Sequence, residues 1–206
     1  MALIQQTQPV LQPVPIASLR PTQMTVGYRE VTRKRHEWRA RIDSDGGDFL
    51  GRHMIPAVIG PGGAHWLIDN HHLARALHDE GVGEVLVSVV ARLDHLGKRR
   101  FMTFMDSRNW LHPYDAVGRR IAYKELPHSI GKLADDPYRS LAGEVRRAGG
   151  YAKVDTPYAE FLWADFLRPR VPAKLVARNF DKAMTRALDA AHGAEATYLP
   201  GYCGPH

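Results

Sequence analysis

The stretch at residues 64–77, AHWLIDNHHLARAL, constrains the fold of this chain more than any other segment. Its first part, residues 65–68, is a short apolar run that follows two glycines, which predicts a strand. Asp69 and Asn70 come next, and apolar residues then recur at helical spacing. Residues 71–77 therefore predict an amphipathic helix that begins directly after the strand.

The junction between this strand and helix predicts an anion site. Asp69 and Asn70 are both good N-cap residues, and His71 and His72 follow in the first helical turn. A helix N-terminus offers backbone N–H groups and the positive end of the helix dipole to an anion. Two imidazoles there add donors, ligands or acid–base groups. The segment at residues 69–72, called the 69–72 turn below, is thus either a phosphate site or a simple helix cap with surface histidines.

The rest of the chain divides into a half with strands and a half that is mostly helical. A polar lead-in at 1–13 and a glycine-containing loop at 43–48 carry no regular pattern. Apolar patterning and proline punctuation predict strands at 14–16, 55–59 and 85–93, and helices at 33–41, 98–109, 114–123, 138–148, 158–167 and 174–192.

This order predicts an α+β fold with a small mixed β-sheet and a C-terminal helical subdomain. We expect a sheet domain at 1–97, a helical subdomain at 98–192 packed on it, and a tail at 193–206. Prolines separate the helices of the second half into runs too short to be stable alone, so the two parts should form one body.

Composition limits the class of protein. The formal net charge is +6, which makes a phosphorylated ligand or polyanion plausible without requiring one. Cys203 is the single cysteine, so neither an internal disulfide nor a cysteine zinc site can form. The N-terminus lacks the pattern of a secretory signal, and the longest apolar run is too short to span a bilayer. We therefore expect a cytoplasmic protein without a membrane partner.

Several segments resemble the ParB/sulfiredoxin superfamily. Residues 14–23 (VPIASLRPTQ) are similar to its opening strand and Arg-Pro turn, and residues 66–76 (WLIDNHHLARA) to its strand, phosphate-binding turn and helix. The match is best with the ParB-like nuclease branch, which carries an Asp-x-His-His signature. Further similarity to this branch lies at residues 55–58, 138–143, 149–153 and 160–167, so the resemblance covers roughly 14–170.

The resemblance implies a nucleotide-binding enzyme. Members of the superfamily bind CTP or ATP at this turn, so it implies ATP, ADP or CTP with Mg²⁺ as cofactors. The implied activity is phosphoryl transfer or phosphate-ester hydrolysis at the 69–72 turn. Partition proteins carry Gly-Glu-Arg-Arg at this position and the sulfinic acid reductase carries Gly-Cys-His-Arg. This chain has neither, so the resemblance does not extend to CTP switching or sulfinate chemistry.

The candidate site residues lie partly in the 69–72 turn and partly elsewhere in the chain. Glu30 corresponds to an early catalytic glutamate of the serine-kinase branch, or is simply a solvated side chain beside Arg29 and Arg33. The candidate catalytic residues are Asp69, His71, His72 and Glu30, with Asp69 also the candidate Mg²⁺ ligand. The candidate nucleotide-binding residues are Asn70, His71, His72, Arg75, Arg100 and Lys153.

Two rival functions use the same residues. One is a metal-dependent nuclease that acts through the 69–72 turn, and the other is a non-enzymatic, nucleotide-gated module that binds DNA or protein. Basic residues outnumber acidic ones at 92–120, which suits either a nucleic acid backbone or a solvated helix face. His65, His71, His72 and His78 match no standard zinc motif. The partners allowed are a nucleotide, a nucleic acid and a second copy of the chain in a homodimer.

Overall fold

The computed structural model describes residues 10–42 and 53–205. The expected lead-in falls mostly, and the expected loop at 43–48 entirely, outside these residues. Contacts divide the chain into two compact units. The first unit comprises residues 1–24, 32–113 and 121–133, and the second comprises residues 25–31, 114–120 and 134–206. Each unit is therefore assembled from segments that are separated in the sequence.

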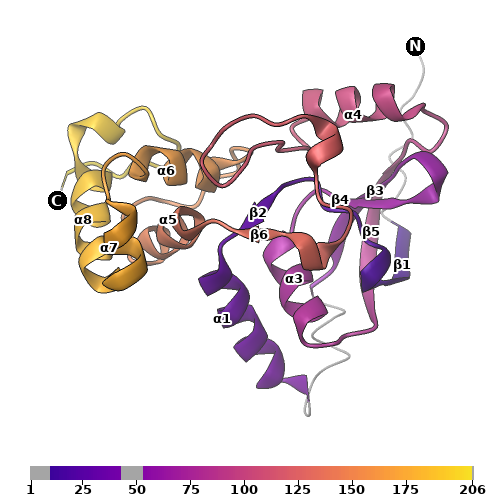
Figure 1. Cartoon of the computed structure of the whole chain (residues 1–206), viewed down its shortest axis with the longest axis horizontal. Helices are drawn as coiled ribbons and strands as arrows, with labels where there is room; N and C mark the ends of the chain where they lie inside the picture. Colours follow the sequence, from indigo (N-terminus) through magenta and orange to yellow (C-terminus); the bar gives the residue numbers. More distant parts are fainter. Residues whose placement is uncertain (1–9, 43–52, 206) are drawn as a thin grey trace. The chain divides into compact units, whose positions relative to one another are not determined.

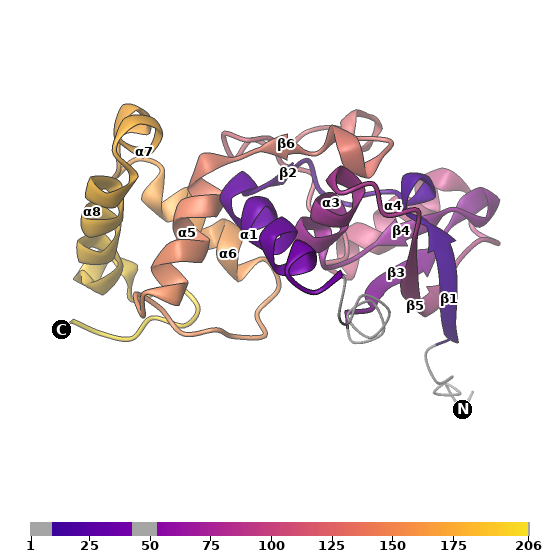
Figure 2. The same cartoon turned by 90° about the horizontal axis from the view of Figure 1, so that it is seen from below.

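The first unit is built on a mixed four-stranded sheet in the order β1-β5-β3-β4. β1 (Val10–Pro15) runs antiparallel to β5 (Glu84–Arg92), which is parallel to β3 (Ile55–Ile59). β4 (His65–Leu67) pairs antiparallel with β3. Figure 2 shows β1, β5 and β3 side by side. The strands expected at 55–59, 65–68 and 85–93 are confirmed to within a residue at each end, whereas the one expected at 14–16 lies earlier in the chain.

Helices cover the sheet of the first unit. α3 (His71–Asp79) follows β4, and α4 (Lys98–Ser107) follows β5; Figure 1 shows them on either side of β3 and β4. Alternate residues of β5 are buried, as a strand with one covered face requires. On the α4 side, Val58 packs in one apolar cluster with Phe101 and Met105. The direct strand-to-helix connection predicted for residues 65–77 is confirmed.

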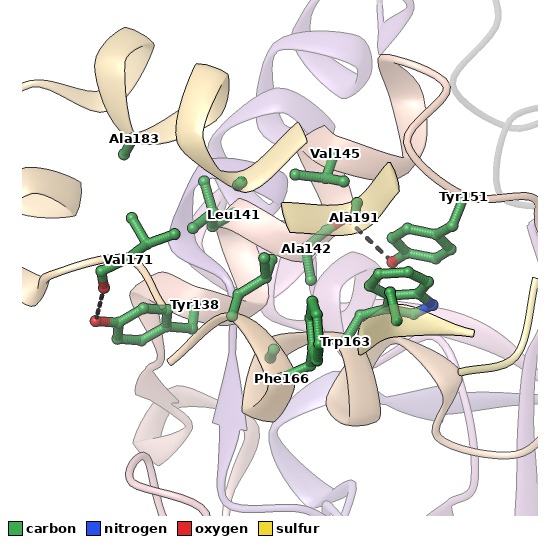
Figure 3. Packing of buried hydrophobic residues seen from close by; sticks show 14 of the residues in the cluster. Tyr138, Leu141, Ala142, Val145, Tyr151, Trp163, Phe166, Val171, Ala183 and Ala191 are labelled. Carbon is green, nitrogen blue, oxygen red and sulfur yellow. Dashed lines mark hydrogen bonds between the residues drawn. The ribbon is translucent and has the colours of Figure 1, made fainter. Parts of the chain in front are cut away.

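The second unit is a helical body with a small parallel ladder between β2 (Thr25–Val26) and β6 (Ala134–Asp135). Its helices are α5 (Pro137–Arg147), α6 (Ala159–Leu167), α7 (Ala173–Arg178) and α8 (Phe180–His192). In its core, Tyr151 stacks on Trp163 with ring centroids 4.3 Å apart (Figure 3). The hydroxyls of Tyr138 and Tyr151 donate to backbone carbonyls, so these rings are buried without unpaired polar atoms.

Two expected helices are corrected by the structure. Residues 114–123 form no α-helix: Tyr114 and Arg120 pair as an antiparallel bridge around a turn, and a 3-10 helix begins only at Tyr123. The Asp115 carboxylate accepts the backbone N–H groups of Val117 and Arg119, which favours a turn over a helix. The helix expected at 174–192 is two helices, because Asn179 leaves the helical region and caps α8 by accepting from the N–H of Lys182.

The remaining helices agree with the sequence in type, with shifted bounds. α4, α5 and α6 confirm the helices expected at 98–109, 138–148 and 158–167. α1 (Tyr28–Arg39) begins earlier than the helix expected at 33–41. The segment expected as a tail packs on the second unit, where Leu199 is buried and Tyr202 bridges to Tyr151.

The α+β class with a small mixed sheet is confirmed. Within the described ranges, no helix combines the length and the apolar composition that a bilayer crossing needs.

Candidate functional site

The 69–72 turn starts α3 without a side-chain cap. Asn70 stands at the N-cap position in the left-handed region, with φ 61° and ψ 28°. Its Nδ2 donates to the carbonyl of Met54 at 3.1 Å, so its amide group is held by a neighbouring segment rather than by the helix. Asp69 is exposed, and its carboxylate accepts the N–H of Asn70 at 2.6 Å. The side chain of Asn70 therefore makes no cap hydrogen bond to the first turn of α3.

His71 connects this turn to a segment far away in the sequence. Its ring is 5% exposed, and its Nε2 accepts the backbone N–H of Thr22 at 3.1 Å. The Thr22 hydroxyl donates to the carbonyl of Leu67 at 2.6 Å. Because Nε2 accepts, the neutral ring carries its proton on Nδ1. His71 thus holds residue 22 against the end of β4, which is a positioning role.

A third segment joins the same place through Thr22. The carbonyl of Thr22 accepts the backbone N–H of His112 at 2.8 Å, and Gln23 forms a parallel bridge with His112. The connection that leads there from α4 contains Asn109 in the left-handed region, with φ 55°. The start of α3, residues 22–23 and the loop after α4 therefore form one locus in the first unit. Sequence patterns identified only the first of these three segments.

The other candidate residues occupy different environments. Arg75 donates to Asp79 and to the carbonyl of Leu133, so its guanidinium is bound one turn beyond the helix start. Arg100 is exposed on α4. Lys153 and Glu30 belong to the second unit, where Lys153 is exposed and Glu30 accepts from Arg147 at 2.6 Å.

Several of the cations at 92–120 have partners within their own unit. Arg119 pairs with Asp115 at 2.9 Å in the second unit. In the first unit, Arg92 lies 3.9 Å from Asp94, and Arg108 lies over the ring of Trp110. Exposed pairs of this kind contribute little stability, but they reduce the charge offered to a polyanion.

A metal held by protein ligands alone finds no support in the described part of the chain. No group of three or more His, Cys, Asp or Glu side chains there could hold an ion. Mg²⁺ is commonly bound by one or two carboxylates together with substrate phosphates and water. Exposed Asp69 at the helix start fits that mode, in which the nucleotide supplies most of the ligands.

The fold is of the α+β class, and a sequence match identifies the family. Residues 12–169 match the family model described as "Putative ParB-like nuclease", which is more than half of the chain. The chain belongs to this ParB-like family. No curated protein matches it significantly.

Two solved structures show how far the similarity reaches. The crystal structure of protein Atu1540 from Agrobacterium tumefaciens is 50% identical, with a TM-score of 0.90, and the match covers 97% of this chain and 99% of that one. The C-terminally truncated chromosome-partitioning protein ParB from Caulobacter crescentus, complexed with CTP-gamma-S, is 11% identical, with a TM-score of 0.32 over 91% of this chain and 94% of that one. At so low a score, nothing about the present chain follows from the second structure.

Proposed function

We propose that the chain is a nucleotide-binding enzyme of the ParB-like family that acts on phosphate esters, with the 69–72 turn as its phosphate site. The observation that carries this proposal is the start of α3, where Asn70 turns its amide away from the helix. A helix N-terminus of this kind offers backbone N–H groups and the positive end of the helix dipole to a phosphate. Family membership supports the proposal independently.

Each residue of the turn would have a separate role in binding or catalysis. The backbone of the first turn would hold the phosphate, and the half-buried ring of His72 would donate to a phosphoryl oxygen. Asp69 would hold Mg²⁺ or accept a proton. His71 would act indirectly, because its Nε2 is already engaged with Thr22. ATP, ADP and CTP are the candidate nucleotides.

The second candidate function is a nuclease, favoured by the description of the family. It would use the same turn, with the phosphodiester in place of the nucleotide phosphates and Mg²⁺ shared between Asp69 and the substrate. A nucleotide-gated binding module is the third, and it would bind nucleotide without turnover.

Calorimetry and a turnover assay with two variants test the proposal. His72→Ala should weaken binding of ATP, ADP or CTP with Mg²⁺ by about ten- to a hundredfold, the effect of losing a charge-assisted hydrogen bond. Asp69→Asn should reduce turnover more than binding, because it removes the charge that would hold Mg²⁺ or take a proton. His95→Ala and Asp94→Asn, both at exposed positions of the first unit, are the matched controls.

The substrates distinguish the three functions. Release of phosphate or its transfer to an acceptor supports the enzyme proposed first, and cleavage of plasmid DNA supports the nuclease. Binding without either reaction supports the binding module. Normal binding and turnover in both turn variants would leave the 69–72 turn as a helix start with no role in ligand binding.

A further inference from the structure

A cavity in the first unit combines cations that have no acidic partner among the described residues with aromatic side chains. Its volume is about 260 Å³, and it lies beside the start of β4 rather than at the 69–72 turn, none of whose residues line it. Four segments contribute to its wall: the loop after β1, the β3–β4 connection, α4 and residues 123–128. All of them belong to the first unit.

The cations of this cavity have no acidic partner among the described residues. Arg20 is anchored by one N–H, which donates from Nη1 to the carbonyl of His128 at 2.7 Å. Its other N–H groups have no acceptor there. Lys98 and Lys124 are exposed and form no ion pair with a described residue, and none of the described residues that line the cavity is a carboxylate. Such a concentration of unpaired positive charge favours an anion.

Aromatic side chains form the apolar part of the wall. Trp66 and Phe101 pack with ring centroids 5.4 Å apart, and the hydroxyl of Tyr123 donates to Asp106 at 2.7 Å, which fixes its ring. Trp66 and Tyr123 are only partly buried, so part of each ring can contact a ligand. The indole Nε1–H of Trp66 is buried, has no acceptor in the described part of the chain, and lies close to Gly60. This wall suits a flat ring.

We propose that this cavity binds a nucleotide monophosphate unit, with the base against Trp66 and Tyr123 and the phosphate between Arg20, Lys98 and Lys124. Aromatic faces with neighbouring cations are the combination by which proteins hold single nucleotides. The volume lies near the lower end of ligand pockets, which begin on the order of 300 Å³, and this favours one nucleotide over a larger ligand. The bound nucleotide is either a free mononucleotide or the end of an oligonucleotide.

This site goes beyond the proposed function and does not depend on it. The 69–72 turn would hold the phosphates on which the enzyme acts, whereas the cavity would recognise a second nucleotide unit. His72→Ala should therefore leave binding in the cavity unchanged, and substitutions in the cavity should leave binding at the turn unchanged.

The test follows the indole N–H signal of Trp66 by NMR in the full-length protein. The chain has four tryptophans, so Trp66→Phe assigns the signal by its loss. The probes are AMP, adenosine, inorganic phosphate and a 5′-phosphorylated dinucleotide. We expect AMP or the dinucleotide to shift the signal at concentrations at least about tenfold lower than adenosine or phosphate alone, because each of these lacks one of the two contacts.

Charge variants complete the test. Lys98→Gln combined with Lys124→Gln should weaken AMP binding about tenfold or more. Lys132→Gln combined with Lys174→Gln removes the same charge at exposed positions that do not line the cavity, and should change AMP binding little. Tighter binding of the dinucleotide would identify an oligonucleotide end, and tighter binding of AMP a free nucleotide.

Three results would overturn the second site: an unmoved Trp66 signal with millimolar AMP and dinucleotide, binding of phosphate alone as tight as that of AMP, or loss of the Trp66 shift in His72→Ala. The last result would mean that turn and cavity are one site. Failure of the proposed function would be seen separately, as normal nucleotide turnover in His72→Ala.

Discussion

His71 shows how a residue in a candidate site can be a structural element of it. His71 is buried, and its Nε2 accepts the backbone N–H of Thr22. We expect His71→Ala to lower the free energy of unfolding by roughly 1–3 kcal/mol, because the Thr22 N–H is left buried without an acceptor. Urea denaturation followed by circular dichroism measures this, with His95→Ala as the exposed control. Equal midpoints for the two variants would contradict the positioning role.

Arg139 on α5 presents the opposite case, a buried charge with unused donors. It is 4% exposed, and its Nε and Nη1 have no hydrogen-bond partner among the residues that the structure describes. Its guanidinium stacks on Phe161, 3.5 Å from the ring centroid. Burial lowers its pKa, against the opposing effect of nearby carboxylates that include Glu160 and Asp136. Removing one partner of a buried ion pair is costly, but these carboxylates keep Arg146 and Arg168 as their own partners.

Arg139→Met tests whether the second unit needs this charge for stability. Methionine keeps much of the contact with Phe161, so we expect stability to change by less than about 1 kcal/mol, whereas Arg139→Ala should cost about 2–4 kcal/mol through the cavity it leaves. Thermal and urea unfolding compare the two. A loss above roughly 3 kcal/mol in Arg139→Met would show that the charge itself stabilises the fold.

His65 on β4 gives the first unit a pH dependence. Burial lowers the pKa of His65, and the charge of Arg92 lowers it further. Below about pH 6.5 the unfolded chain takes up a proton that the folded chain resists, so stability is full above that pH and falls as the pH drops towards the folded pKa. We expect the urea midpoint to fall between pH 7.5 and 5.5, and less steeply in His65→Gln. Parallel profiles for both proteins would contradict this contribution.

At the scale of elements, the start of α3 depends on the left-handed conformation of Asn70. Asparagine and glycine adopt it more easily than other residues. Asn70→Ala should therefore destabilise the protein by about 1–2 kcal/mol, and Asn70→Gly by less, although both lose the bond to the Met54 carbonyl. Chemical denaturation measures the difference between the variants. If alanine were tolerated as well as glycine, the backbone conformation would not limit this helix start.

The elements that could be predicted from sequence are those with local signals. The strand and helix at 65–77 were predictable because apolar periodicity changes from strand to helix at Asp69 and Asn70. The helix wrongly expected at 114–123 carried a competing local signal, the side-chain bonds of Asp115 to two backbone N–H groups. The break at Asn179 is of the same kind, since one asparagine ends one helix and caps the next.

The candidate site was predictable only in part, because its contacts join distant segments. Nothing in the local sequence indicates that Thr22 binds His71, 49 residues away. Local sequence patterns likewise cannot predict the cavity beside β4, because its cations Arg20, Lys98 and Lys124 come from three separate segments. Residue types indicated the turn as a candidate site, and tertiary contacts were needed to find what surrounds it.

At the scale of the whole molecule, neither compact unit is a single continuous stretch of the chain. The first unit draws on residues on both sides of position 97, the boundary expected from the sequence. α4 lies beyond that boundary, yet its Phe101, Met102 and Met105 are buried against the sheet residue Val58. A sheet face that loses its helix exposes apolar residues to water, at a cost of about 25 cal/mol per Å².

Two fragments test this dependence on α4. We expect residues 1–97 alone to be unfolded or to unfold without cooperativity, because the face covered by α4 would be open. Residues 1–133 contain every segment assigned to the first unit, together with residues 25–31 and 114–120, which belong to the second unit. This fragment should therefore unfold cooperatively. Circular dichroism and NMR dispersion of both fragments measure the difference. A cooperative transition in 1–97, or a stable proteolytic product ending near residue 95, would show instead that the sheet domain folds without α4 and that the boundary at 97 is physical.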